Sequence, residues 1–197
     1  MNHRRSSVSQ HRTGFREGPR SVLDYEKFIG HEGSELRFHI ESPGAGHFHV
    51  LSKEEILLRL ERLPKYVQCN LNMIVLPRMT RKRKLMDIYG LQWDRTIYLY
   101  PMNDDLRHDM GRYISPLYRI EALKYGGSII EGADENVIQW TPESIHHYYL
   151  ENILIHEIGH TFDIKNMRAA DREAFAEDFV CKFGDRGLRR KHVKSAS

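Results

Sequence analysis

The chain has 197 residues, of which 29% are charged and 40% hydrophobic, and its formal net charge is +3. This length suits one domain that buries a core without disulfides or structural metals, and no apolar run is long enough to cross a bilayer. The two cysteines form no disulfide framework, and the basic N-terminus lacks the apolar core of a secretion signal. We therefore expect a cytoplasmic protein with reduced thiols and no membrane contact.

Positive residues gather in the first twenty positions, in "RKRK" at 81–84 and in the tail "RGLRRKHVK". We predict a disordered basic arm over residues 1–20, one folded domain over 21–185 and a basic tail over 186–197. Each cluster could contact phosphate or an acidic partner. No nucleic-acid motif accompanies them, so we interpret them as solvated segments and expect no nucleic-acid partner.

The first folded segment, "ELRFHIESPGAGHFHV" at 35–50, alternates apolar and polar residues around a Pro-Gly turn. This pattern predicts a β-hairpin with one apolar face. The opposite face carries three histidines, which could bind a metal, although half-exposed strands often carry polar side chains there. The apolar face would hold Phe38, Ile40, Phe48 and Val50, and the polar face His39, Glu41, His47 and His49.

A helix is predicted over "SKEEILLRLERLP", because Ser52 and Glu55 form a capping-box pattern and Pro64 ends it. The next apolar segments, "YVQCNLNMIVLP" and "RTIYLYP", predict strands, the first of them central. A further short helix should begin at "SP" (115–116) and end at "GG" (126–127). Together these elements predict an α+β fold.

A longer helix follows, which "TPE" at 141–143 begins with an N-cap, a first-turn proline and an acidic residue. His156 and His160 lie one turn apart on it, so their imidazoles can converge on one zinc ion at about 2.0–2.1 Å. Glu157 lies beside that face and can take a proton from a metal-bound water. Alternatively, the H-E-x-x-H pattern arises by chance, and hydrogen bonds satisfy the polar nitrogens of the two histidines.

The surroundings of these residues favour the metal-site interpretation. The helix is apolar over most of its circumference, which is typical of a central helix. Two histidines and a glutamate buried there need a partner, which a metal supplies. Gly159 lowers helix stability, so we expect another segment or a substrate strand to approach it closely. The apolar residues are Leu150, Ile153, Leu154, Ile155, Ile158 and Phe162.

A second helix is predicted over "ADREAFAEDFVCKFG", with Asp171 as its cap and Gly184 as its stop. It carries Glu173 and Glu177 one turn apart. Two histidines and one carboxylate, with a fourth position open to water, are the arrangement of a catalytic zinc. In a pair of antiparallel helices either glutamate can reach a histidine, so geometry leaves both open as the third ligand.

"HEIGHTFD" followed by "EAFAEDF" resembles the gluzincin zinc metallopeptidases, and most of all the ImmA/IrrE-type and lethal-factor-like peptidases. The resemblance covers residues 150–180. It implies a zincin fold in which a mixed sheet has an edge strand along the cleft, and "RTIYLYP" is the candidate for that strand. It implies Zn2+ held by His156, His160 and Glu173, with Glu157 as the general base and Glu177 beside the ligands.

Two departures from these families concern the connection between the helices. Only the twelve residues 161–172 separate the second histidine from Glu173, and Asn166 replaces the tyrosine that lethal-factor-like enzymes place seven residues before the third ligand. The residue that stabilises the oxyanion is therefore unassigned. Tyr113, Tyr125 and Tyr149 are candidates, although each is more often a packing aromatic.

We therefore expect a zinc-dependent endopeptidase that acts on a peptide or protein substrate. One alternative is a regulatory protease with one specific, DNA-associated protein partner, in which the basic clusters serve for docking. The other is a zinc-binding module without catalysis. Metal content and turnover of an unfolded substrate distinguish the three.

Overall fold

The computed structural model describes residues 35–84, 88–132 and 135–185. The predicted basic arm over residues 1–20 and the basic tail over residues 186–197 lie outside these ranges and stay predictions. Among the described residues, no helix is both long enough and apolar enough to span a bilayer.

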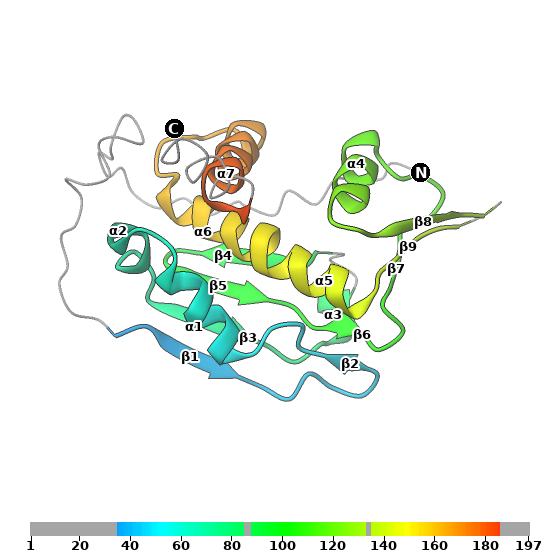
Figure 1. Ribbon diagram of the computed structural model, residues 1–197, viewed down its shortest axis with the longest axis horizontal. Helices are drawn as coiled ribbons and strands as arrows, with labels where there is room; N and C mark the ends of the chain where they lie inside the picture. Colours follow the sequence, from blue (N-terminus) through cyan, green and yellow to red (C-terminus); the bar gives the residue numbers. More distant parts are fainter. Residues whose placement is uncertain (1–34, 85–87, 133–134, 186–197) are drawn as a thin grey trace, which may run out of the picture.

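The main sheet has four strands in the order β1, β3, β5 and β4. The first three are mutually parallel, whereas β4 pairs antiparallel with β5 and forms one edge of the sheet (Figure 1). A mixed sheet with helices is compatible with the predicted α+β class. The bounds are β1 Arg37–Ile40, β3 Met73–Leu76, β4 Gly90–Trp93 and β5 Thr96–Leu99.

Two smaller sheets and a set of helices surround the main sheet. The two-stranded sheet pairs β2 with β6, and the three-stranded sheet has the order β7, β9 and β8. These strands are β2 His47–Phe48, β6 Met102–Asn103, β7 Arg107–Asp109, β8 Ser128–Glu131 and β9 Asn136–Gln139. The helices are α1 Lys53–Glu61, α2 Lys65–Gln68, α3 Arg81–Lys84, α4 Pro116–Lys124, α5 Pro142–Tyr148, α6 Leu154–Phe162 and α7 Ala169–Phe183.

The predicted β-hairpin over residues 35–50 is wrong, because its two strands join different sheets. β1 pairs in parallel with β3, and β2 pairs antiparallel with β6. The chain after β1 stays beside the chain after β3, through hydrogen bonds from Glu41 N to Leu76 O (2.9 Å) and from Met79 N to Pro43 O (2.9 Å). Alternating apolar residues identify a strand, but they do not identify its partner.

The helix starts follow the sequence signals closely. In α1 the Ser52 hydroxyl accepts from Glu55 N at 3.2 Å, and Glu55 Oε2 accepts from Ser52 N at 2.8 Å, which completes the capping box. α4 begins at Pro116 and α5 at Pro142, each after its predicted N-cap. β3 lies in the sheet interior as predicted, but residues 65–68 before it form α2 instead of strand.

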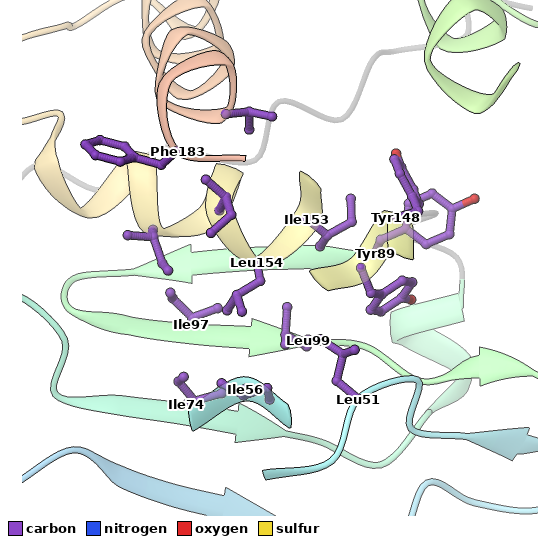
Figure 2. Close-up of a cluster of buried hydrophobic side chains, with 14 of the residues drawn as sticks. Leu51, Ile56, Ile74, Tyr89, Ile97, Leu99, Tyr148, Ile153, Leu154 and Phe183 are labelled. Carbon is purple, nitrogen blue, oxygen red and sulfur yellow. The ribbon is translucent and has the colours of Figure 1, made fainter. Parts of the chain in front are cut away.

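α5 and α6 are joined by a π-helical turn, Tyr149–Ile153, so residues 142–162 form one continuous helix. Its α6 part packs on β4 and β5. Leu154 is fully buried at this contact, together with Ile97 of β5 and Ile74 of β3 (Figure 2). The helix that carries both candidate histidines is therefore fixed against the centre of the core.

A buried ion pair connects α1 to the long helix and to the end of α7. Nε and Nη2 of Arg59 each donate to one carboxylate oxygen of Glu151 at 2.9 Å, and Nη2 also donates to the carbonyl of Phe183 at 2.6 Å. Arg59 is 1% exposed and Glu151 6%. Such bidentate pairs hold both partners in one geometry.

Replacing Arg59 by methionine should lower the free energy of unfolding by about 3–5 kcal/mol, because the Glu151 carboxylate stays buried without its partner. Urea denaturation measures the change. Arg119→Met is the control, since the pair of Arg119 with Glu131 is exposed and should contribute less than about 1 kcal/mol. Equal effects of the two substitutions would contradict this account.

Candidate metal centre

Three of the predicted site residues converge between α6 and α7. Nε2 of His156 lies 3.1 Å from Nε2 of His160, as expected for imidazoles one turn apart. Oε2 of Glu173 lies 3.3 Å from Nε2 of His156, and Oε1 lies 3.7 Å from Nε2 of His160. The three donor atoms lie within 4.8 Å of one another, and this is the one such group found among the described residues. The cluster could hold a metal ion.

The approach of α7 to α6 depends on Gly159. A Cβ atom at this position would lie 2.9 Å from Cβ of Phe179 and 3.1 Å from Cα of Ala176, so any side chain would push the helices apart. Phe179 also stacks on Phe162, with ring centroids 5.5 Å apart. The segment that was expected to approach Gly159 is therefore α7, which begins at Ala169, with Arg168 and not Asp171 at the cap position.

Burial and charge give the two histidines opposite protonation states. Burial opposes a charged ring at His156, but the carboxylates of Glu173, Glu157 and Glu177 outweigh it and raise the pKa of His156 to about 9. Burial and the neighbouring His156 lower the pKa of His160 to about 4. The surroundings therefore stabilise positive charge at His156, while His160 stays neutral at pH 7.

Glu157 follows His156 on the same helix, and its side chain lies beside the edge strand β4. Its side chain is buried, and burial raises the pKa of its carboxyl to about 7, in the range suited to proton transfer at neutral pH. A Cβ atom on Gly90 of β4 would lie 2.7 Å from Oε1 of Glu157 and 3.0 Å from Cγ2 of Ile153. Gly90 therefore leaves the space that the Glu157 carboxyl occupies.

The two candidate third ligands occupy different places. Oε1 of Glu177 lies 3.6 Å from Nδ1 of His156, on the opposite ring nitrogen from the one that faces Glu173. A carboxylate at that nitrogen can orient a ligating imidazole. Behind it, Glu121 of α4 accepts a hydrogen bond from Asn152 of the π-helical turn, and burial together with the Glu177 carboxylate raises the pKa of Glu121.

Arg172 links α7 to the edge strand, and sequence reasoning did not identify it. Nη2 of Arg172 donates to Oε1 of Gln92 in β4 at 3.4 Å, and Nε lies 3.9 Å from Oδ2 of the buried Asp163. Its charge acts on both Glu157 and His160. The one feature of the sequence that could have identified Arg172 is its position directly before Glu173.

The strand beside the site is β4, not "RTIYLYP". That segment forms β5, which pairs with β3 on one side and with β4 on the other, so it is an interior strand. Gly90–Trp93 pairs with β5 alone among the described strands and lies against α6. The sequence did not reveal β4 because it begins with a glycine, and its turn at Asp94, with a φ of 53°, lacks the usual glycine.

The N-terminal histidines are not brought together into a metal site. Nδ1 of His47 contacts the Ala45 carbonyl at 2.8 Å, and Nε2 of His49 contacts the Glu41 carbonyl at 2.7 Å. Nε2 of His39 lies 3.5 Å from Oε1 of Glu41. One ring nitrogen of each histidine makes a contact within this segment, as polar strand residues commonly do.

The tyrosines considered for the oxyanion do not form one group. Tyr149 is buried and donates its hydroxyl to the Tyr100 carbonyl at 2.9 Å. Tyr125 packs against the ring of Tyr148, with centroids 5.2 Å apart, and Tyr113 is 70% exposed. Tyr149 is thus committed to a structural hydrogen bond.

Gly159→Ala should destabilise the protein by about 1–3 kcal/mol, because the added methyl group overpacks the contact between α6 and α7. Ala174→Gly on the exposed face of α7 is the matched control, since there alanine should be the more stable residue by about 1 kcal/mol. Thermal unfolding of both variants checks this. A gain of stability in Gly159→Ala would show that the helices tolerate a wider spacing.

Comparisons of this chain with protein-family models, with curated proteins and with solved structures find no match. A functional proposal therefore rests on the chemistry of the donor set, which is in any case where function is determined.

Proposed function

We propose that this protein is a zinc-dependent peptidase of the gluzincin type, with Zn2+ held by His156, His160 and Glu173. The observation that carries the proposal is the convergence of these three donor groups within 4.8 Å, beside a buried glutamate and an edge strand. Two imidazoles and one carboxylate with an open position are the usual ligands of a catalytic zinc.

The residues present fit such an ion in both chemistry and charge. The carboxylates of Glu173, Glu157 and Glu177 favour a positive charge at His156, where zinc would have to replace the proton because a ligating imidazole is neutral. A divalent cation would satisfy the same carboxylates. Zinc bound there would lower the pKa of a water molecule to about 7 and would polarise a carbonyl. Glu177, on Nδ1 of His156, would fix the orientation of that ring.

Glu157 is the group that moves the proton in this proposal. Its carboxyl is buried beside His156, with a pKa of about 7, so it can accept a proton from water and later donate it to the leaving amine. Gly90 has no Cβ atom and so leaves the space for its Oε1 beside the edge strand. The proton acceptor thus lies where a peptide on β4 would pass.

β4 is the strand to which we propose that the substrate binds. An edge strand offers unpaired backbone groups, with which an extended peptide can form an additional strand. Its burial pattern leaves Trp93 exposed and the other three residues half-buried. Main-chain hydrogen bonds would supply affinity independent of sequence, and side-chain contacts would supply selectivity.

Glu157→Gln should retain zinc and lower kcat/KM for peptide hydrolysis by about 10²–10⁴-fold, because the amide keeps the shape of the side chain and cannot accept the proton. Metal analysis and peptide assays on the same preparation measure both quantities. Glu143→Gln is the matched control, since Glu143 is an exposed glutamate of the same long helix. Full activity in Glu157→Gln would exclude Glu157 as the base.

Glu173→Ala should lose zinc and activity together, because it removes a ligand. Glu177→Ala should keep a site of about 10–100-fold lower affinity, because it removes only the partner of the Nδ1 atom of His156. Competition with a zinc chelator measures both affinities. The reverse order of the two losses would make Glu177 the ligand.

Turnover of unfolded casein distinguishes this proposal from its two alternatives. A general peptidase should degrade casein when loaded with zinc. Activity restricted to one native protein would identify a regulatory protease, and stoichiometric zinc without turnover of any substrate would identify a binding module.

A further inference from the structure

A basic cluster lies on and beside α3, and the proposed function does not use it. We define this α3 cluster as Arg78, Arg81, Lys82 and Lys84, all of which are exposed. Arg83 behaves differently, since it lies 3.6 Å from Oε2 of Glu41 and over the ring of Tyr100. One residue therefore anchors the segment, while the other four present their charges to solvent.

The contact of Arg83 with Tyr100 places this cluster at the beginning of the edge strand. The guanidinium carbon lies 5.9 Å from the centre of the Tyr100 ring. Tyr100 N donates to Tyr89 O at 2.9 Å, which extends the pairing of β5 with β4 by one residue before Gly90. α3 accordingly lies beside the first residues of β4 (Figure 1).

Glu157 contacts the same end of β4. Gly90, the first residue of the strand, faces Oε1 of Glu157 at the position where a Cβ atom would approach it to 2.7 Å. A peptide paired with β4 that passes Glu157 would therefore have one end near Trp93, the last residue of the strand, and the other end near α3. In an antiparallel pairing, which is the more stable arrangement, the end toward α3 is C-terminal.

We propose that the protein selects peptide substrates with acidic side chains C-terminal to the scissile bond, and that the α3 cluster recognises them. The inference rests on the proposed peptidase function and names its substrate class. Four exposed cations in seven residues produce a positive surface at this end of the strand, and the nearby Glu41 is already bound to Arg83. Charge complementarity of this kind determines specificity.

Strand geometry gives the span of a peptide bound along β4. Residues of a β-strand advance about 3.3 Å each, so the first four residues after the bond cover about 13 Å. Their side chains alternate between the two faces, so acidic residues should be favoured at alternate positions within this span.

The test is digestion of a proteome-derived peptide library with the full, zinc-loaded chain, followed by identification of the new termini by mass spectrometry. The most frequently cleaved sequence is then synthesised with glutamate, glutamine or lysine at the favoured positions. At low salt, kcat/KM should be about tenfold higher for the glutamate peptide than for the lysine peptide, and high salt should reduce this ratio.

Arg81→Glu combined with Lys82→Glu should abolish or invert the ratio. Both side chains are exposed, and the variant leaves the Arg83 anchor intact. Arg37→Glu combined with Lys53→Glu is the matched control, because it makes the same change of charge near β1, at the opposite edge of the sheet. The control should keep the preference for glutamate.

Binding provides a second readout, measured by fluorescence anisotropy of the same three peptides on Glu157→Gln. The glutamate peptide should bind about tenfold more tightly than the lysine peptide, in parallel with kcat/KM.

Cleavage without any charge preference would overturn this inference and leave the peptidase proposal standing. Neither cleavage nor peptide binding would overturn both. A labelled oligonucleotide that binds through Arg81 and Lys82 when the acidic peptide does not would assign the cluster to nucleic acid.

Discussion

The close contact between α6 and α7 at Gly159 is the constraint on which the candidate site depends. His156 and His160 are fixed relative to each other by the helix repeat alone, but Glu173 reaches them only because α7 lies against the α6 backbone. A helix carrying any side chain at position 159 would hold α7 further away. The glycine lowers the intrinsic stability of α6 by about 1 kcal/mol relative to alanine, and close packing against Phe179 offsets that loss.

A second set of contacts fixes the long helix on its other side. The π-helical turn before α6 directs Glu151 toward Arg59 and Asn152 toward Glu121, so two successive residues form buried polar contacts with different helices. Because Arg59 also binds the carbonyl at the end of α7, the same guanidinium fixes both helices of the site. π-helical turns often occur at functional sites, and this one redirects side chains without ending the helix.

The sequence identified the parts of this structure that depend on local chemistry. Capping residues located the starts of α1, α4 and α5, and the helix repeat placed His156 beside His160. The spacing left Glu173 and Glu177 both open as the third group, and only the family resemblance favoured Glu173. The sequence did not show which distant strands pair with each other, so the predicted hairpin was wrong and β5 was mistaken for the edge strand. Edge position depends on which strands lie on either side, and that is a property of the whole sheet. The contacts of Gly90 and Arg172 with the site likewise depend on β4 and could not be inferred locally.

The charge balance of the site explains why so many acidic groups are gathered around one helix. Glu157, Glu173 and Glu177 all act on the ring of His156, and Glu121 lies behind them. Carboxylates placed so close repel one another, and burial adds to the unfavourable free energy of the charges on Glu157 and Glu121. The imidazolium of His156 offsets only part of this repulsion, and Arg172 offsets a smaller part. A divalent cation between the donor atoms would offset far more, because it carries twice the charge at a shorter distance. The charge balance is therefore compatible with the proposed metal site, since a cation there would meet the same carboxylates.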